Sequence, residues 1–181
     1  MKGICFTDVD GVFNYELFYA PRNYKEVKKQ LRKDVKSEKI ERLEYYKSQI
    51  DTEKLQMFSL MVNDLDLGVV ISSTWKHSGS IQELQEMFDY CGGTFKILDV
   101  TGSCECRHRG CEVKQWLVDN CEKYFGVHYF DFFDWVIIDD DRDFLLEQAN
   151  HFFWVDSYAG LTPNICNRID HFFTHKMFKD R

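Results

Sequence analysis

Short, unbroken apolar runs alternate along this chain with stretches of helical periodicity, and this alternation limits the fold more than any other feature. The apolar runs occupy residues 3–8, 68–73, 95–98, 135–138 and 151–155. Apolar runs without a two-residue alternation indicate strands that are covered on both faces. Helical spacing fills the intervals, at residues 24–50, 53–65, 79–90, 110–124 and 143–149. We therefore predict an α/β fold in which helices cover both sides of an open parallel sheet.

Length and charge narrow the class of protein further. The 181 residues suit a single domain, spanning 1–181. A net charge of −7 disfavours a broad surface for coating nucleic acid, which needs clustered Lys and Arg, although a local basic groove stays open. No apolar run reaches the roughly 18–20 residues of a membrane span. The short apolar start and the 7 cysteines favour reduced thiols in a cytoplasmic protein.

Reactive polar residues stand at the ends of three predicted strands. The first strand ends in Asp8 and Asp10, the second in Ser72 and Ser73, and a later one in the acidic run 139–141. Ligands of open parallel sheets bind beyond the carboxyl ends of the strands, so these groups are expected to converge if the strands are neighbours. Carboxylates that lie so close together need a cation, and hard oxygen ligands suit Mg²⁺.

Such a cluster is suited to phosphoryl transfer. A carboxylate can attack phosphorus when a metal neutralises the phosphoryl oxygens, and a second carboxylate two residues later can shuttle the proton. Gly11 permits a sharp turn after Asp10, and Ser72 can hydrogen-bond a phosphoryl oxygen. A calcium loop would place oxygen ligands where Val12, Phe13 and Tyr15 stand, so that reading is disfavoured.

The ordered motifs resemble those of the haloacid dehalogenase (HAD) superfamily of phosphatases. Residues 8–12 (DVDGV) resemble its first motif, 69–72 (VVIS) its second, and 136–140 (VIIDD) its fourth. Residues 72–76, 109–117 and 160–162 also resemble the HAD domains of viral and bacterial nucleic-acid end-repair proteins. The resemblance covers roughly residues 3–162 and implies a three-layer, Rossmann-like α/β/α sheet.

The resemblance also assigns roles by position. It implies that Asp8 is the nucleophile and that Asp10 is the general acid and base, with its backbone carbonyl on the metal. Asp139 and Asp140 would complete a Mg²⁺ site with Asp8 and Asp10, and Ser72 would bind phosphate.

The basic residue of the third motif has several candidates. Lys114, at the start of a predicted helix, is the first choice as the phosphate clamp, Arg109 the second, and Lys76 also competes. Ser73 is a further candidate contact for phosphate. For Ser72, a structural role as a helix cap is the alternative, and for Trp75 the core is favoured over a substrate platform.

Residues 14–52 stand where this superfamily inserts a cap, so the resemblance implies a small helical cap there. The segment is rich in basic residues that would suit a polyanion, although a solvated helix face is the favoured explanation for them: Lys25, Lys28, Lys29, Arg32, Lys33 and Lys36.

A separate cysteine-rich run occupies residues 104–111. Cys104, Cys106, His108 and Cys111 are four soft ligands, but the paired Cys-x-x-Cys spacing typical of zinc sites is absent. Free thiols in a loop are therefore favoured over zinc.

The main hypothesis is a Mg²⁺-dependent phosphomonoesterase that acts through a phosphoaspartyl intermediate. Its substrate would be a phosphorylated small molecule or a nucleic-acid end, and the end-repair resemblance favours a nucleotide or polynucleotide phosphate. A small-metabolite phosphatase and a non-catalytic phosphate-binding scaffold of the same fold are the alternatives.

Overall fold

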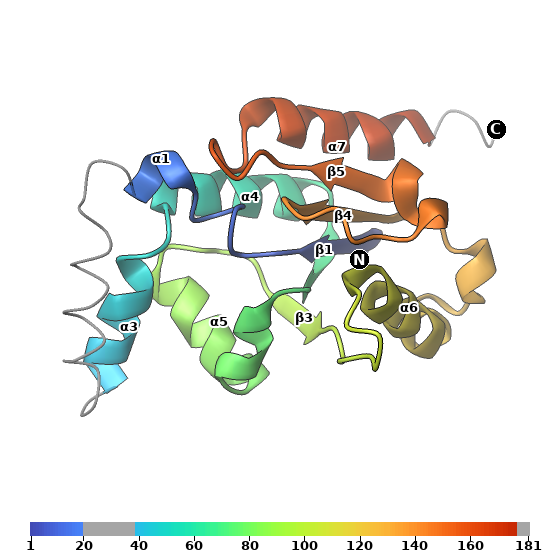
Figure 1. The fold of residues 1–181 in the computed structure, drawn as a ribbon. Helices are drawn as coiled ribbons and strands as arrows, with labels where there is room; N and C mark the ends of the chain where they lie inside the picture. The colour runs from blue at the N-terminus through green and yellow to red at the C-terminus, as the bar shows by residue number, and fades with distance from the viewer. Residues whose placement is uncertain (20–38, 177–181) are drawn as a thin grey trace.

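The computed structural model describes residues 1–19 and 39–176, which form an α/β structure around one parallel sheet (Figure 1). The sheet has five strands in the order β3-β2-β1-β4-β5, and every neighbouring pair is parallel. The strands are β1 (Gly3–Thr7), β2 (Leu67–Ile71), β3 (Ile97–Val100), β4 (Trp135–Asp139) and β5 (Phe152–Trp154). The predicted α/β class with a parallel sheet is confirmed.

Helices of different length connect and cover the strands. The α-helices are α1 (Glu16–Tyr19), α3 (Lys39–Lys47), α4 (Thr52–Asp64), α5 (Ile81–Tyr90), α6 (Arg109–Phe125) and α7 (Pro163–Lys176). The described residues also form the short 3₁₀ helices η2 (Thr74–Ser78), η3 (Tyr129–Asp131) and η4 (Leu146–His151). Of the predicted cap segment 14–52, residues 20–38 lie outside the described part, and with them the six basic residues for which a polyanion is the alternative to a solvated face.

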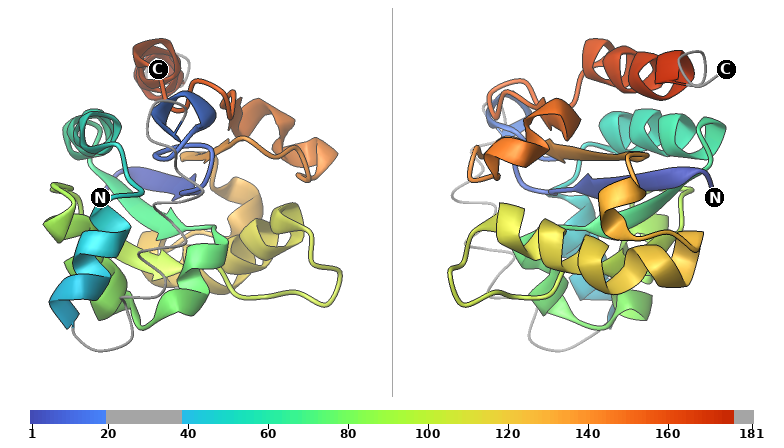
Figure 2. Two further views of the ribbon diagram at one scale, coloured as in Figure 1. Left: turned by 60° about the vertical axis from the view of Figure 1, so that its left-hand side comes forward. Right: turned by 90° about the vertical axis from the view of Figure 1, so that its right-hand side faces the viewer.

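Alternate residues of the buried strands feed two separate cores. Cys5 packs with α4, α5 and α7 on one face, whereas Ile4 and Phe6 pack with α6 on the other. Figures 1 and 2 show α4 and α7 side by side over one face of the sheet, with α6 on the other side of the sheet. Because both faces are covered, the strands need apolar side chains at every position, which explains the unbroken apolar runs.

Strand register places the ends of β1, β2 and β4 level with one another. Thr7 is aligned with Ile71 of β2 and with Ile138 of β4. The backbone confirms this alignment, since the Asp8 amide donates to the Ile138 carbonyl at 3.0 Å and the Ser72 amide to the Thr7 carbonyl at 2.9 Å. β1 and β4 also form the switch point of the sheet, because the chain builds outward from β1 to β3 and then returns to the other side of β1.

Two predicted elements differ from the structure, and one helix was not predicted. The strand expected at residues 95–98 begins at Ile97 instead, because the Phe95 ring packs against Phe58 and Phe88 at centroid distances of 5.1 and 5.4 Å. The helix expected at 143–149 is the short η4. Helix α7 was not predicted, although Thr162 followed by Pro163 is a typical helix start.

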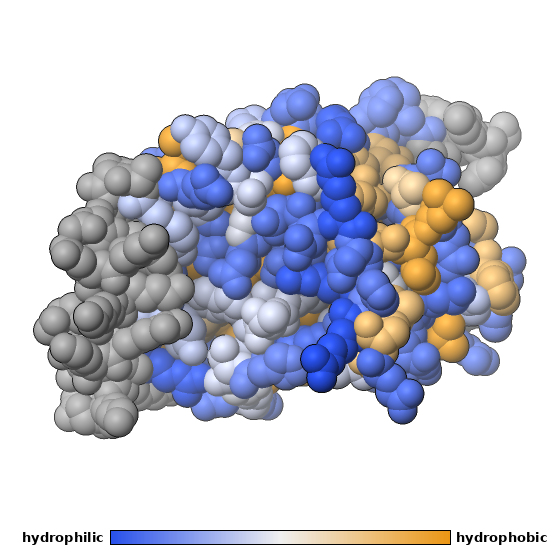
Figure 3. Space-filling view, in the orientation of Figure 1, coloured by the Kyte–Doolittle hydropathy of each residue, from blue (hydrophilic) through white to orange (hydrophobic). Residues whose placement is uncertain are grey.

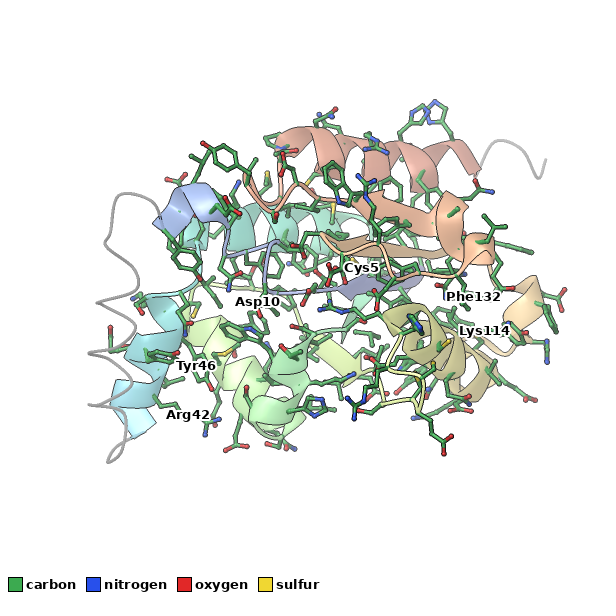
Figure 4. The ribbon with its side chains drawn as sticks, in the orientation of Figure 1. Cys5, Asp10, Arg42, Tyr46, Lys114 and Phe132 are labelled. Atoms are coloured by element: carbon green, nitrogen blue, oxygen red, sulfur yellow. The ribbon has the colours of Figure 1, made fainter. Side chains whose placement is uncertain are left out.

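The surface is uneven in character. Figure 3 shows a face that is largely hydrophilic, with apolar side chains gathered toward the end opposite α3. At that end a hollow is lined by aromatic residues around η3, among them Tyr129, Phe130, Phe132 and Phe133. Figure 4 places Phe132 and Lys114 together there, far from Asp10.

One glycine gives a test of the packing between α6 and the loop before η4. A Cβ atom built on Gly110 would lie 2.6 Å from the Leu145 amide nitrogen and 2.9 Å from the Phe144 Cα. Alanine normally stabilises a helix by about 1 kcal/mol relative to glycine. We expect Gly110→Ala to destabilise this protein instead, by roughly 1–3 kcal/mol, because backbone has to move. Urea unfolding measures the change.

Gly102→Ala is the matched control, since a Cβ there meets no atom within 4 Å. We expect its free energy of unfolding to stay within about 0.5 kcal/mol of the parent. A Gly110→Ala protein more stable than the parent would contradict the packing described here.

Candidate active site

Asp8 is the buried centre of the site. It follows β1 directly and is only 1% exposed, because β2 and β4 flank it on either side. The Val9 amide donates to its Oδ1 at 2.7 Å, and the Arg109 guanidinium forms an ion pair with its Oδ2. The carboxylate is therefore held in one orientation at the carboxyl end of the central strand.

Two further carboxylates from β4 join Asp8. Asp139 ends β4 and is fully buried, and Asp140 follows it. One carboxylate oxygen from each of Asp8, Asp139 and Asp140 lies within 4.8 Å of the others. The close approach depends on Gly11, whose φ is +74° and whose missing side chain leaves room for the Asp140 carboxylate.

The electrostatics of these acids call for a cation. Burial, and then repulsion from Asp8, raises the pKa of Asp139 to about 8 and that of Asp140 to about 6. Burial also raises the pKa of Asp8, although Arg109 and a hydrogen bond from Ser73 oppose the shift. Three carboxylates face one guanidinium, so negative charge remains in excess. Their oxygen ligands, close spacing and charge fit a hard divalent cation such as Mg²⁺.

Arg109 reaches the acids from α6, which packs on the face of the sheet opposite α4, α5 and α7. It is the first residue of α6, and its Nη1 donates to Asp139 Oδ2 at 2.6 Å and to the Ser72 carbonyl at 3.1 Å. Asp143 Oδ2 accepts from the Arg109 amide at 3.1 Å and so anchors the helix start. One guanidinium therefore contacts the ends of β1, β2 and β4 together.

The other two basic candidates are placed differently. Lys76 Nζ donates three hydrogen bonds, to Glu112 Oε2 at 2.6 Å, to the Gly102 carbonyl at 2.9 Å and to Thr101 Oγ1 at 3.1 Å. Lys114 does not join the acids, because its Nζ pairs with Glu147 at 2.8 Å near the aromatic hollow (Figure 4). Lys114 stands more than one helical turn beyond Arg109, which points it to another part of the surface.

The two serines after β2 have different environments. Ser72 Oγ is buried and has no hydrogen-bond partner within the described part of the chain. Ser73 caps η2, where its Oγ accepts from the Trp75 amide at 3.3 Å. A buried hydroxyl without a partner costs free energy unless a ligand or water satisfies it, so Ser72 is available to an incoming oxygen.

Asp10 stands beside Asp8, Asp139 and Asp140 and faces outward. Asn14 Nδ2 donates to its Oδ1 at 2.6 Å, and the Trp75 indole N–H donates to its Oδ2 at 3.0 Å. The Asn14 side chain also accepts from the Gly11 amide at 3.0 Å, which closes the turn. Asp10 is thus exposed but held in place at the mouth of the site.

An aromatic pocket of about 300 Å³ opens next to Asp10. Its walls come from α3, η2 and the turn after β1, and they include Tyr45, Tyr46, Gln49, Thr74, Trp75 and Ser78. The Tyr46 ring lies 5.2 Å from the Trp75 ring, and Figure 4 shows Tyr46 on α3 across from Asp10. Trp75 therefore serves the core, as predicted, and also lines the pocket.

Sequence reasoning missed several of these residues. Asn14 and Glu112 belong to the site only as hydrogen-bond partners of Asp10 and Lys76, and the fold creates these contacts. The Tyr45–Tyr46 pair did carry a signal, since it is an aromatic pair in an otherwise charged helix.

No described helix is both long enough and apolar enough to cross a bilayer. Searches among curated proteins and among solved structures found no match. A family model for the HAD domain in Swiss Army Knife RNA repair proteins matches residues 4–165, which contain the three acids, Ser72 and Arg109. With the parallel sheet and its cluster of carboxylates, this match shows that the chain belongs to that family of HAD domains.

Proposed function

We propose that this protein is a Mg²⁺-dependent phosphomonoesterase that forms a phosphoaspartyl intermediate on Asp8. The observation that carries the proposal is the buried Asp8 carboxylate, paired with the Arg109 guanidinium, at the strand ends where Ser72 has a buried hydroxyl with no hydrogen-bond partner among the described residues. A phosphoryl group in front of Asp8 would find a nucleophile, a cation and a hydrogen-bond donor on three adjacent strand or helix ends. The HAD membership of the chain supports a phosphatase-like activity in general.

The reaction would take two displacements. An Asp8 carboxylate oxygen attacks phosphorus, the bond to the leaving oxygen breaks, and Asp10 gives that oxygen a proton. Asp10 then takes a proton from water as the water oxygen attacks the phosphoaspartate, which releases phosphate and restores Asp8. The outward position of Asp10, fixed by Asn14 and Trp75, suits a group that meets both the leaving group and water.

Metal and guanidinium would divide the charge of the phosphoryl group between them. Asp8, Asp139 and Asp140 would hold Mg²⁺, together with the Asp10 carbonyl, and the ion when bound supplies neutralisation of the phosphoryl oxygens. Arg109 is the better phosphate clamp on this geometry, because it already contacts Asp8 and Asp139 whereas Lys114 pairs with Glu147. Lys76 and Ser73 would support the loop that presents Ser72.

The aromatic pocket favours a nucleotide or polynucleotide end as substrate. Tyr45, Tyr46 and Trp75 line the pocket beside Asp10, where the leaving group of a phosphomonoester would lie. Stacking of a base on an aromatic side chain contributes about 1–3 kcal/mol and tolerates any base. A small sugar phosphate would leave these rings unused, which is why we place a small metabolite second.

Asp8→Asn tests the nucleophile. We expect it to lower the Mg²⁺-dependent kcat for p-nitrophenyl phosphate by about 10⁴-fold or more, since an amide cannot form the covalent intermediate. Circular dichroism and urea unfolding should show a folded protein, because the buried negative charge is removed without a change in volume. Asp119→Asn, on the exposed side of α6, is the matched control and should keep full activity.

Full activity of Asp8→Asn would exclude the assigned nucleophile. If the parent protein hydrolyses none of the nucleotides, phosphorylated oligonucleotides and sugar phosphates offered with Mg²⁺, yet binds phosphate, the non-catalytic scaffold is the better interpretation.

Thermal unfolding with and without Mg²⁺ tests the metal site directly. A ligand at 100 times its Kd stabilises the folded state by about 2.7 kcal/mol, so saturating Mg²⁺ should raise the Tm of the parent. The double variant Asp139→Asn, Asp140→Asn should lose this rise. Asp119→Asn should keep it, and an equal rise in the double variant would place the metal elsewhere.

Tyr45→Ala and Tyr46→Ala test the substrate class. We expect each to raise KM for a terminally phosphorylated oligonucleotide by at least about fivefold, the equivalent of about 1 kcal/mol of stacking, and to leave KM for glycerol phosphate, whose leaving group has no ring to stack, unchanged. Phe130→Ala, an exposed aromatic of the distant hollow, is the control. Unchanged KM values for the oligonucleotide would favour a small-metabolite phosphatase.

A further inference from the structure

Three cysteines outside the acidic site have their sulfur atoms close together. Sγ atoms of Cys104, Cys106 and Cys111 all lie within 4.8 Å of one another, and the first two are 3.1 Å apart. None of the three is buried. The remaining cysteines are each buried in the cores, namely Cys5, Cys91, Cys121 and Cys166. The thiols that lie outside the cores are thus the ones that gather.

A tight turn brings the thiols together. The Arg107 amide donates to the Cys104 carbonyl at 3.1 Å, and Arg107 takes a φ of +57°, which an L-residue rarely adopts. The Cys111 amide then donates to the His108 carbonyl at 3.0 Å in the first turn of α6. As a result, two sulfurs from the turn face the third sulfur on the helix.

The loop that carries the thiols has little else to order it. No residue from 102 to 108 is buried, so none of their side chains anchors the loop in either core. A left-handed arginine costs roughly 1–3 kcal/mol and persists only where other interactions impose it. Thiols that converge in a loop with no side chain in a hydrophobic core are typical of a structural metal site.

We infer that Cys104, Cys106 and Cys111 bind a Zn²⁺ ion as thiolates. Zn–S bonds of about 2.3 Å in a tetrahedral site put sulfur atoms about 3.8 Å apart, so small side-chain rotations would complete it. The fourth position is left to water or to the imidazole of His108, which stands at the start of α6. Soft sulfur ligands select a different metal from the hard carboxylate oxygens around Asp8, so the two sites would not compete.

The bound ion would connect this loop to the acidic site. Arg109, whose guanidinium contacts Asp8 and Asp139, lies between Cys106 and Cys111 in the chain. A metal that joins the loop to the first turn of α6 would restrict the backbone on both sides of Arg109. Its role would therefore be structural, as an anchor for the residue that balances the acids.

Cobalt provides the probe, because Co²⁺ bound by thiolates shows charge-transfer absorption. We expect the full-length, reduced protein to bind one equivalent of Co²⁺ with this signature and Zn²⁺ to displace it. Cys104→Ser, Cys106→Ser and Cys111→Ser should each weaken Co²⁺ binding by at least about 100-fold, because serine is a poor ligand for either ion. Cys121→Ser, on the same helix but buried against the sheet, is the matched control and should keep the signature.

A second measurement covers variants that do not fold. In the unmutated protein, Zn²⁺ should protect the three cysteines from iodoacetamide, mapped by peptide mass, and a chelator should expose them. His108→Ala decides the fourth ligand: weaker binding assigns the imidazole, and unchanged binding assigns water. Either result leaves the three thiolates in place.

Three results would overturn the inference. One is an unchanged Co²⁺ spectrum in the triple serine variant, and another is the absence of thiolate absorption in a fully reduced parent protein. The third is a Cys104–Cys106 disulfide that reforms in the presence of Zn²⁺, seen as a loss of two hydrogens by mass. None of these depends on phosphatase activity, so failure here is separate from failure of the proposed function.

Discussion

The pairing of β1 with β4 forces buried carboxylates together, and the rest of the site depends on how that charge is balanced. Register places Asp8 beside Asp139, and both lie at the switch point of the sheet where helices do not cover the strand ends. Such a group of acids is unfavourable without cations, as the raised pKa values of Asp139 and Asp140 indicate. The protein accepts this local cost where a charged ligand and a metal would relieve it.

Arg109 connects the helix on one face of the sheet with the acids at the strand ends. It begins α6, which packs on the opposite face of the sheet from α4, α5 and α7, yet its guanidinium reaches the ends of β1, β2 and β4. Its backbone is held by Asp143 on one side, and the proposed zinc site would hold it on the other. The placement of α6 therefore determines whether a guanidinium balances the charge of the acids.

The surroundings of Asp10 carry the information about substrate. The buried acids would treat any phosphoryl group alike, because they contact only phosphorus and its oxygens. The aromatic pocket of α3 and η2 adjoins Asp10, so in the proposed reaction the leaving group would be the part of a substrate that meets Tyr45, Tyr46 and Trp75. In this arrangement the sheet would supply the chemistry and the described part of the cap segment would supply the selection.

By itself, the sequence determined the fold class and the acids, because both are written in short segments. Unbroken apolar runs report strands buried on two faces, and Asp8, Ser72 and Asp139 follow such runs directly. Side chains that act across long separations were decided only by the tertiary structure. Arg109 rather than Lys114 reaches the acids because α6 begins at Arg109, and Tyr46 meets Trp75 because α3 packs near η2. Local spacing predicts which strand a residue ends, but only packing decides which side chains share a space.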